Sequence, residues 1–271
     1  MAEKMEHHQA ELIHYLLQMQ AYLPLETYIQ DNFESKFAAV RPYLQLAQAI
    51  LNVDIDRIEQ LASTCNQQYL LKPTTLQQKV YFYSHYLNLQ LRRQEYGDYF
   101  RGLTPVLVDV FRLLIENDFM PEINQYMTPV VKDTVDGKPL YRGLQWYQQK
   151  IEEKPNKVQE TFDKYYGSRF NYDHYVSSTH LIKLIEDHSH KSKLKELAMK
   201  LRYIEKYMRN IIAHEVITVD EDLIQTRVKM SMTDIHELYL ETLVFAGLTD
   251  QRQWDAFEKL HEIIKQHLEI S

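Results

Sequence analysis

Residues 194–214 read LKELAMKLRYIEKYMRNIIAH and carry the clearest pattern in the chain. Apolar side chains recur there at steps of three and four residues, which is the period of an α-helix with one buried face. The spacing predicts a long helix over about residues 191–216. At 100° per residue, its core face is expected to consist of Leu194, Leu197, Leu201, Ile204, Met208, Ile211 and Ile212.

The polar side of this predicted helix consists of two stripes. The first contains aromatic and hydrogen-bonding side chains, namely Tyr203, Tyr207, Asn210 and His214. The second is basic and contains Arg202, Lys206, Arg209 and the small Ala213. Arg209 and His214 are five residues apart, which places them about 140° apart around the helix. They therefore flank the face that points away from the core.

These residue types can cleave RNA without a metal ion. Histidine can transfer protons near neutral pH because its unperturbed pKa is about 6.5. Arginine stays charged and matches phosphate oxygens with a planar fork of donors. We therefore predict that His214 transfers the proton or positions the 2′-oxygen, that Arg209 stabilises the transition state, and that Asn210 orients the phosphate or the histidine. The neighbouring side chains predicted to bind the RNA are Arg202, Lys206, Tyr203 and Tyr207.

The Arg-x4-His spacing is weak on its own, since a second copy occurs at Arg169–His174. That copy contains bulky aromatic residues and has no small residue before its histidine, so we do not expect it to be a site.

The form Arg209-Asn210-x-x-Ala213-His214 is more specific than the spacing alone. It resembles the HEPN ribonuclease superfamily, whose motif is Arg-x4–6-His, often with a polar residue after the arginine and alanine before the histidine. The chain looks more particularly like the accessory ribonucleases of type III-A CRISPR systems (the Csm group).

The resemblance implies a chain of three parts: a sensory CARF domain, a helical segment and a HEPN domain. This sequence is similar to the last two parts and has no stretch that resembles the sensory domain, which binds cyclic oligoadenylate. That ligand is therefore expected to be a partner only if a separate sensory domain is present. The resemblance also implies a homodimer in which two copies complete one active site. Single-stranded RNA is the expected substrate, because a flexible strand can adopt the in-line geometry that an A-form helix resists.

Helical periods dominate the remaining sequence, and we predict an all-α fold. Glycine and proline are scarce, at 6 and 8 of 271 residues, and there is no glycine-rich phosphate loop. Residues 127–139 are rich in turn-forming residues and are predicted to be a loop at the domain boundary. We therefore expect a helical segment over 1–135 and a HEPN-like helical bundle over 136–271. Further expectations are a helix at about 140–152 and an irregular connection over 219–231.

The net charge of −7 argues against nonspecific coating of nucleic acid. Residues 150–210, however, carry 13 Lys and Arg against 9 Asp and Glu, so the block that leads into Arg209 is net positive. A single cysteine, Cys65, and a polar N-terminus favour the reducing cytoplasm. No apolar stretch is long enough to span a membrane.

We expect no cofactor and no metal site, because His188 and His190 do not share a helix face and His7-His8 lies at the terminus. The open alternative to the enzyme is a non-catalytic helical module that binds RNA or protein.

Overall fold

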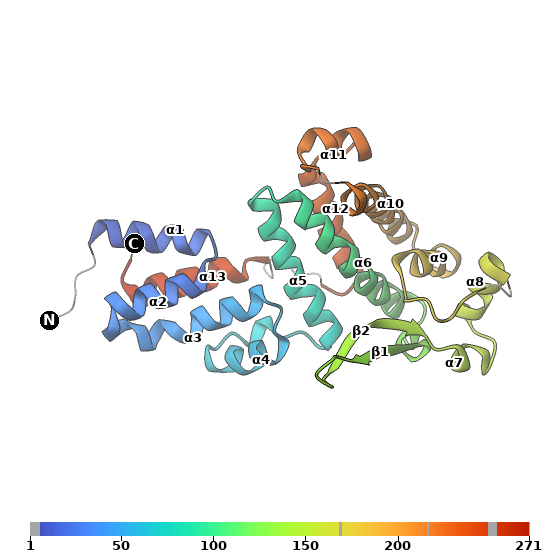
Figure 1. The fold of residues 1–271 in the computed structure, drawn as a ribbon, viewed down its shortest axis with the longest axis horizontal. Helices are drawn as coiled ribbons and strands as arrows, with labels where there is room; N and C mark the ends of the chain where they lie inside the picture. Colours follow the sequence, from blue (N-terminus) through green and yellow to red (C-terminus); the bar gives the residue numbers. More distant parts are fainter. Residues whose placement is uncertain (1–5, 168–169, 216, 249–253, 271) are drawn as a thin grey trace. The chain divides into compact units, whose positions relative to one another are not determined.

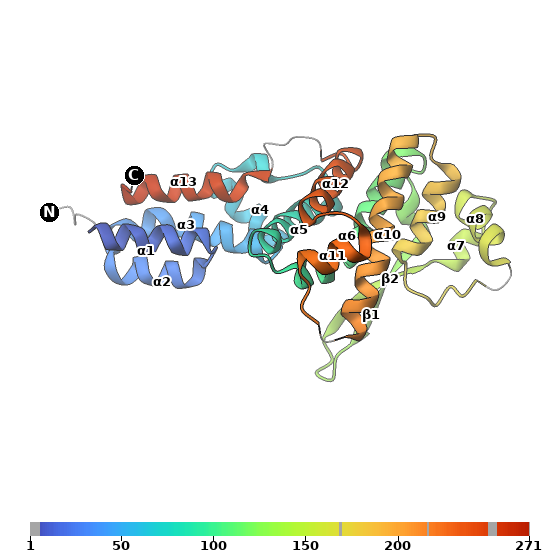
Figure 2. The ribbon, with the colours of Figure 1, turned by 90° about the horizontal axis from the view of Figure 1, so that it is seen from above.

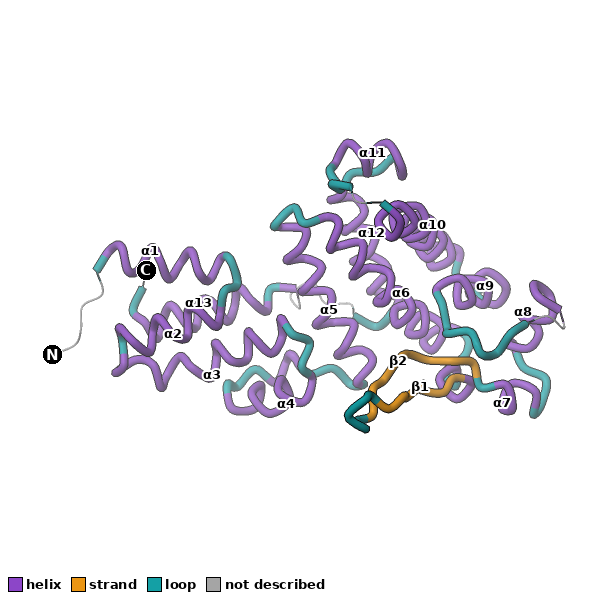
Figure 3. The backbone as a smooth tube through the Cα atoms, viewed as in Figure 1, coloured by secondary structure: helices purple, strands orange, loops and turns teal. Residues whose placement is uncertain are grey.

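The protein is represented by a computed structural model that describes residues 6–167, 170–215, 217–248 and 254–270. The predicted all-α fold is confirmed, since helices account for most of the described residues (Figure 3). The chain divides into two compact units, one of residues 1–86 with 250–271 and one of residues 87–249. The predicted border at 135 and 136 falls in a tight turn of the second unit, between residues 133 and 139. The division into 1–135 and 136–271 stays a prediction.

The first unit joins the two ends of the described chain in one helical bundle. Helix α3 packs against both α2 and α13, so the C-terminal helix completes the N-terminal bundle (Figure 1). The ring of Tyr22 stacks on Phe257 at 6.0 Å, and its hydroxyl lies 2.8 Å from Nε2 of His261. The elements are α1 (His7–Gln18), α2 (Tyr22–Asn32), α3 (Glu34–Leu51), α4 (Ile55–Thr64), η1 (Gln68–Leu70), the first part of α5 (Thr75–Arg92), and α13 (Ala256–Leu268).

The second unit is built around two helices of equal length, α6 and α10, which pack on each other. Both also contact α9 and α12 (Figure 2). Buried apolar side chains of these four helices form the core between them. The elements are α6 (Tyr96–Asp118), η2 (Ile123–Tyr126), β1 (Met127–Asp133), β2 (Pro139–Trp146), α7 (Gln148–Glu152), α8 (Lys157–Tyr166), α9 (Ser178–His188), α10 (Ser192–His214), α11 (Glu221–Val228) and α12 (Met232–Phe245).

The loop predicted for residues 127–139 is wrong, as is the helix predicted to begin at 140. Strands β1 and β2 instead form an antiparallel hairpin, the one sheet among the described residues (Figure 3). Val130 and Val131 are β-branched residues that favour an extended backbone, and the register shifts between them. The tight turn contains Gly137 at φ 70°, a conformation that glycine adopts without strain. The short helix α7 begins only after the hairpin, at Gln148.

The irregular connection predicted for 219–231 is also wrong, since residues 221–228 form helix α11. The side chain of Asp220 caps this helix by accepting a hydrogen bond from the backbone N–H of Leu223 at 2.9 Å. The carboxylate of Glu221 then accepts the backbone N–H of Met232 at 3.1 Å. These two local bonds stabilise a helix whose apolar period is too short to recognise. Within the described ranges, every helix is too short or too polar to cross a lipid bilayer.

Two buried histidines of the second unit are held in the neutral form. The indole N–H of Trp146 donates to Nδ1 of His180 at 3.0 Å, which requires a free lone pair on that nitrogen. Nδ1 of His236 lies 3.0 Å from the hydroxyl of the buried Tyr99. Burial, with smaller effects from nearby cations, lowers the pKa of His180 to about 4 and that of His236 to about 4.

We expect the free energy of unfolding to decrease as the pH falls from about 6.5 towards 4. The unfolded chain takes up protons on these histidines near pH 6.5, whereas the folded chain takes them up only near pH 4. Each histidine therefore removes on the order of 3 kcal/mol of stability across that window. Urea unfolding at pH 7.0, 6.0 and 5.0 measures this loss. The His236→Gln variant should lose less stability over this range than the unsubstituted chain, whereas His7→Gln, at an exposed residue, should not differ from it.

Candidate active site

Helix α10 positions the predicted site, and its core face explains where it lies. Leu194, Leu197, Leu201, Ile204 and Met208 are all buried, as predicted. Ile211 and Ile212, the last two residues of the predicted face, are only half-buried. The helix therefore rises out of the core towards its C-terminal end. It ends at His214, since the backbone of Glu215 is already extended.

The three predicted catalytic residues lie on this emerging end. Arg209 exposes 43% of its side chain, and Asn210 and His214 are exposed as well. All three are therefore accessible to a substrate as large as an RNA strand. Their position within the last two turns of α10 agrees with the predicted polar face. The catalytic roles assigned to them stay predictions.

The buried carboxylate of Glu205 lies next to Arg209. Glu205 is buried, and its Oε2 accepts hydrogen bonds from Nη1 of Arg202 at 2.6 Å and from the Ser178 hydroxyl at 3.0 Å. Its Oε1 lies 3.1 Å from Nη1 of Arg209, which is an ion pair without hydrogen-bond geometry. A buried charge is stable only when opposite charges and hydrogen bonds compensate it. The charge of Glu205 therefore attracts the partly exposed guanidinium of Arg209, whereas its hydrogen bonds go to Arg202 and Ser178.

Arg202 is the least accessible of the predicted RNA-binding residues. Only 14% of its side chain is exposed, and its Nη2 donates to the Thr179 hydroxyl at 2.5 Å. An RNA contact by Arg202 stays a prediction, and it would compete with these bonds. Sequence reasoning missed Glu205, although its spacing from Arg202 and Arg209 is three and four residues. This spacing places all three side chains on one side of a helix, and it is the signal that could have identified the carboxylate.

The remaining predicted RNA-binding residues form an exposed aromatic pair with a cation beside it. The rings of Tyr203 and Tyr207 have centroids 4.4 Å apart, and both side chains are well exposed. Nζ of Lys206 lies 5.8 Å from the centre of the Tyr207 ring. Exposed aromatic faces with neighbouring positive charge are typical of surfaces on which single-stranded bases stack.

A pocket opens directly beside Arg209. It has a volume of about 340 Å³ and lies between α6 and α10. Residues of α10 form one wall and residues of α6 the other. The lining consists of Phe100, Arg101, Thr104, Pro105, Arg209, Ile212 and Ala213.

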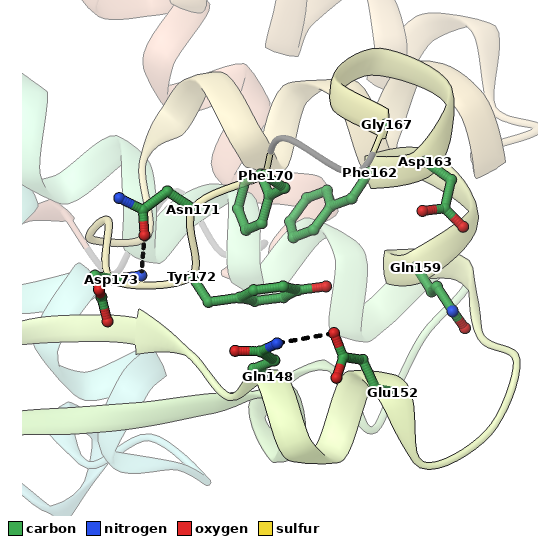
Figure 4. Close-up of a pocket in the computed structure, with 10 residues that line it drawn as sticks. All are labelled: Gln148, Glu152, Gln159, Phe162, Asp163, Gly167, Phe170, Asn171, Tyr172 and Asp173. Atoms are coloured by element: carbon green, nitrogen blue, oxygen red, sulfur yellow. Dashed lines mark hydrogen bonds between the residues drawn. The ribbon is translucent and has the colours of Figure 1, made fainter.

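A second pocket of about 370 Å³ lies away from the predicted residues, among α7, α8 and the segment that follows α8 (Figure 4). The ring of Tyr172 extends across it, and its lining includes the carboxylates of Glu152, Asp163 and Asp173 (Figure 4). Burial, and then Glu152 and Asp163, raise the pKa of Tyr172. These carboxylates would repel a phosphate group, so this pocket does not suit an RNA backbone.

The histidine of the second Arg-x4-His copy does not lie on a helix, unlike His214. Arg169 lies outside the described residues. His174 is exposed in a turn that precedes α9, not on a helix. In the described part of the chain, no three His, Cys, Asp or Glu side chains come close enough to hold a metal ion.

The helical unit with an exposed Arg-x4-His motif at the end of a long helix defines a HEPN-type domain. Residues 66–265 match the family described as the Cas_Csm6 HEPN domain, and the chain belongs to that family. The predicted resemblance is thereby confirmed. The matched stretch begins well before residue 136, where the sequence placed the start of this domain.

A solved structure of Csm6 from Enterococcus italicus, bound to cyclic hexa-2'-fluoro-hexa-dAMP, has the same fold. The TM-score is 0.65 at 12% sequence identity. The likeness covers 95% of this chain but 56% of the Enterococcus chain, so this chain spans little more than half of that protein. None of the curated proteins compared with the chain matches it.

We expect the coupling energy between Arg202 and Glu205 to exceed about 1.5 kcal/mol, because a hydrogen bond between two charged groups is shielded from water there. A double-mutant cycle of Arg202→Met and Glu205→Gln, followed by urea unfolding, measures this coupling. The matched control is Lys200 with Glu196, an ion pair on the same helix whose side chains are about half exposed. That pair should couple much more weakly than the buried pair, because solvent screens both of its charges. Equal coupling in the two cycles would contradict the role of Glu205 as a buried anchor.

Proposed function

We propose that the chain is a metal-independent endoribonuclease that cleaves single-stranded RNA in CRISPR type III antiviral defence. The observation that carries this proposal is the exposure of Arg209 and His214 at the end of α10, with Arg209 in an ion pair with the buried Glu205. Membership of the Cas_Csm6 HEPN domain family supports it. The single cysteine, Cys65, suits the reducing cytoplasm, where such an enzyme would meet its RNA.

The reaction uses the nucleophile that RNA itself carries. The 2′-hydroxyl attacks the adjacent phosphorus, the bond to the 5′-oxygen of the next nucleotide breaks, and a 2′,3′-cyclic phosphate remains. The 2′-hydroxyl loses its proton and the departing 5′-oxygen gains one. His214 serves one of these transfers or positions the 2′-oxygen, since an imidazole can gain and lose a proton near neutral pH. Arg209 stabilises the charge that develops on the phosphate oxygens. Asn210, on the exposed side of the same helix, orients the phosphate or the imidazole. Imidazole and guanidinium together supply what a metal ion would otherwise provide.

The surrounding surface supports the choice of a single-stranded substrate. Tyr203 and Tyr207 offer exposed rings on which bases can stack, and Lys206 adds positive charge next to them. These rings require bases that are already unpaired, which a duplex does not present. Arg202 contributes to binding through the network that also holds Arg209.

One Arg–His pair is a sparse active site, and we propose that a second copy completes it. Two-fold symmetry places the same surface patch of each subunit at the interface. The exposed ends of two α10 helices would then place two arginines and two histidines around one phosphodiester. The solved Enterococcus structure contains cyclic hexa-2'-fluoro-hexa-dAMP, and a cyclic oligoadenylate would control the present chain only where a sensory domain accompanies it.

Replacing His214 by Ala is expected to reduce cleavage of a labelled single-stranded RNA by 10²- to 10⁴-fold, the usual contribution of a general acid or base. Arg209→Ala should reduce it by about 10²- to 10³-fold. His174→Ala, from the second copy of the motif, is the matched control and should retain activity within about twofold. Unchanged cleavage in the folded His214→Ala variant would contradict the catalytic role assigned to His214. RNA binding without cleavage by the unsubstituted chain would instead identify a non-catalytic module.

The composite site predicts that activity depends on association. The turnover rate per chain should fall when the protein is diluted below the dissociation constant of its dimer, because the monomer lacks half of the site. Sedimentation at the same concentrations would show whether the loss of activity follows the loss of the dimer. A turnover rate that stays constant while the dimer dissociates would rule out a shared site.

A further inference from the structure

The pocket beside Arg209 is positioned to receive a group attached to the phosphate that Arg209 binds. Arg209, Ile212 and Ala213 belong to the pocket wall, and they lie on the same turns of α10 as the predicted catalytic residues. An RNA phosphate held by Arg209 would therefore lie at the rim of the pocket. The group nearest to that phosphate, other than its sugar, is a base.

The walls suit a flat aromatic ring. Phe100 and Pro105 from α6 and Ile212 and Ala213 from α10 make the pocket mainly apolar. Its volume of about 340 Å³ is at the lower end of the range for small-molecule sites, which begins near 300 Å³. Ala213, which precedes His214 in the chain, contributes only a methyl group to the wall.

Charge distinguishes this pocket from the acidic one in Figure 4. Its lining contains two arginines, Arg101 and Arg209, and no carboxylate. A nucleotide, with an apolar base and an attached anion, is complementary to that combination. An organic cation would suit the pocket of Figure 4 better, since carboxylates line it.

Arg101 is the side chain that can read the base. Its Nη1 lies 2.6 Å from Oδ1 of Asp98, three residues earlier on α6, and both side chains are more than half exposed. An exposed ion pair of this kind contributes little stability, so the guanidinium can turn to a ligand at small cost. Its fork offers donors only, and the base edge that accepts two parallel donors is O6 with N7 of guanine.

We propose that this pocket binds a guanine base adjoining the scissile phosphate, with Arg101 donating to its O6 and N7. The proposal rests on the proposed function, because Arg209 must hold the phosphate of the same nucleotide. Adenine places an amino donor where guanine has O6, and pyrimidines lack N7, so each loses at least one of the two bonds. Arg101 would thus be a residue that determines specificity, separate from the catalytic pair.

The test measures binding, so that it does not depend on cleavage. The probe is a fluorescent oligouridine strand with one central guanosine, made 2′-deoxy at every position. Anisotropy should show tighter binding than to the matching adenosine probe by about 5- to 150-fold. Replacing guanosine by 7-deazaguanosine should remove most of this preference. Arg101→Lys, which keeps the charge but loses the fork, should remove it as well.

Arg41→Lys is the matched control, since Arg41 is another exposed arginine paired with a carboxylate, Glu26. This variant should keep the full preference for guanosine. Equal binding of the guanosine and adenosine probes, or a preference that Arg101→Lys leaves intact, would overturn the proposal.

A parallel cleavage assay on all-ribose probes separates this proposal from the proposed function. Cleavage without any preference for guanosine would agree with the proposed ribonuclease activity and contradict the proposed guanine site. Guanosine-selective binding that depends on Arg101, without cleavage, would support the guanine site and contradict the proposed ribonuclease activity.

Discussion

The buried carboxylate of Glu205 is the constraint on which the candidate site depends. It accepts hydrogen bonds from Arg202 and Ser178 in the interior, and its other oxygen contacts Arg209 at the surface. A carboxylate that is removed from water must keep its cationic partners, because an uncompensated buried charge is strongly destabilising. The ion pair with Glu205 therefore favours one position of the Arg209 guanidinium before any substrate arrives. Such a restraint matters for a group that has to meet developing charge on a phosphate with little reorganisation.

The packing of α10 against α6 converts this local network into a surface. The core face holds α10 against its neighbours as far as Met208, and the helix then leaves the core over its last turns. The same departure exposes Arg209, Asn210 and His214 and leaves a pocket between the two helices. One geometric feature, a helix longer than the core that supports it, thus accounts for both the exposed motif and the cavity beside it.

The sequence predicted those features that follow from a long, regular period. The all-α fold, the α10 core face from Leu194 to Met208 and the family could all be inferred from the residues. The hairpin was missed because proline and glycine in residues 127–139 favour turns as strongly as valine favours strands. Helix α11 was missed because its stability comes from the cap formed by Asp220 rather than from an apolar stripe. Glu205 was overlooked because a glutamate in a polar helix is usually exposed, and its burial depends on Ser178 from another helix. The pocket needs two helices, so no local pattern could predict it.

The central claim is that an imidazole and a guanidinium on α10 direct the RNA's own 2′-hydroxyl against its phosphate. The most direct measurement is the chemical identity of the ends produced from a single-stranded RNA in the presence of EDTA, read by mass spectrometry. The account predicts 2′,3′-cyclic phosphate and 5′-hydroxyl ends, and no cleavage at any position where the ribose is replaced by 2′-deoxyribose. Ends that carry a 5′-phosphate, or cleavage that persists at the 2′-deoxy positions, would contradict it.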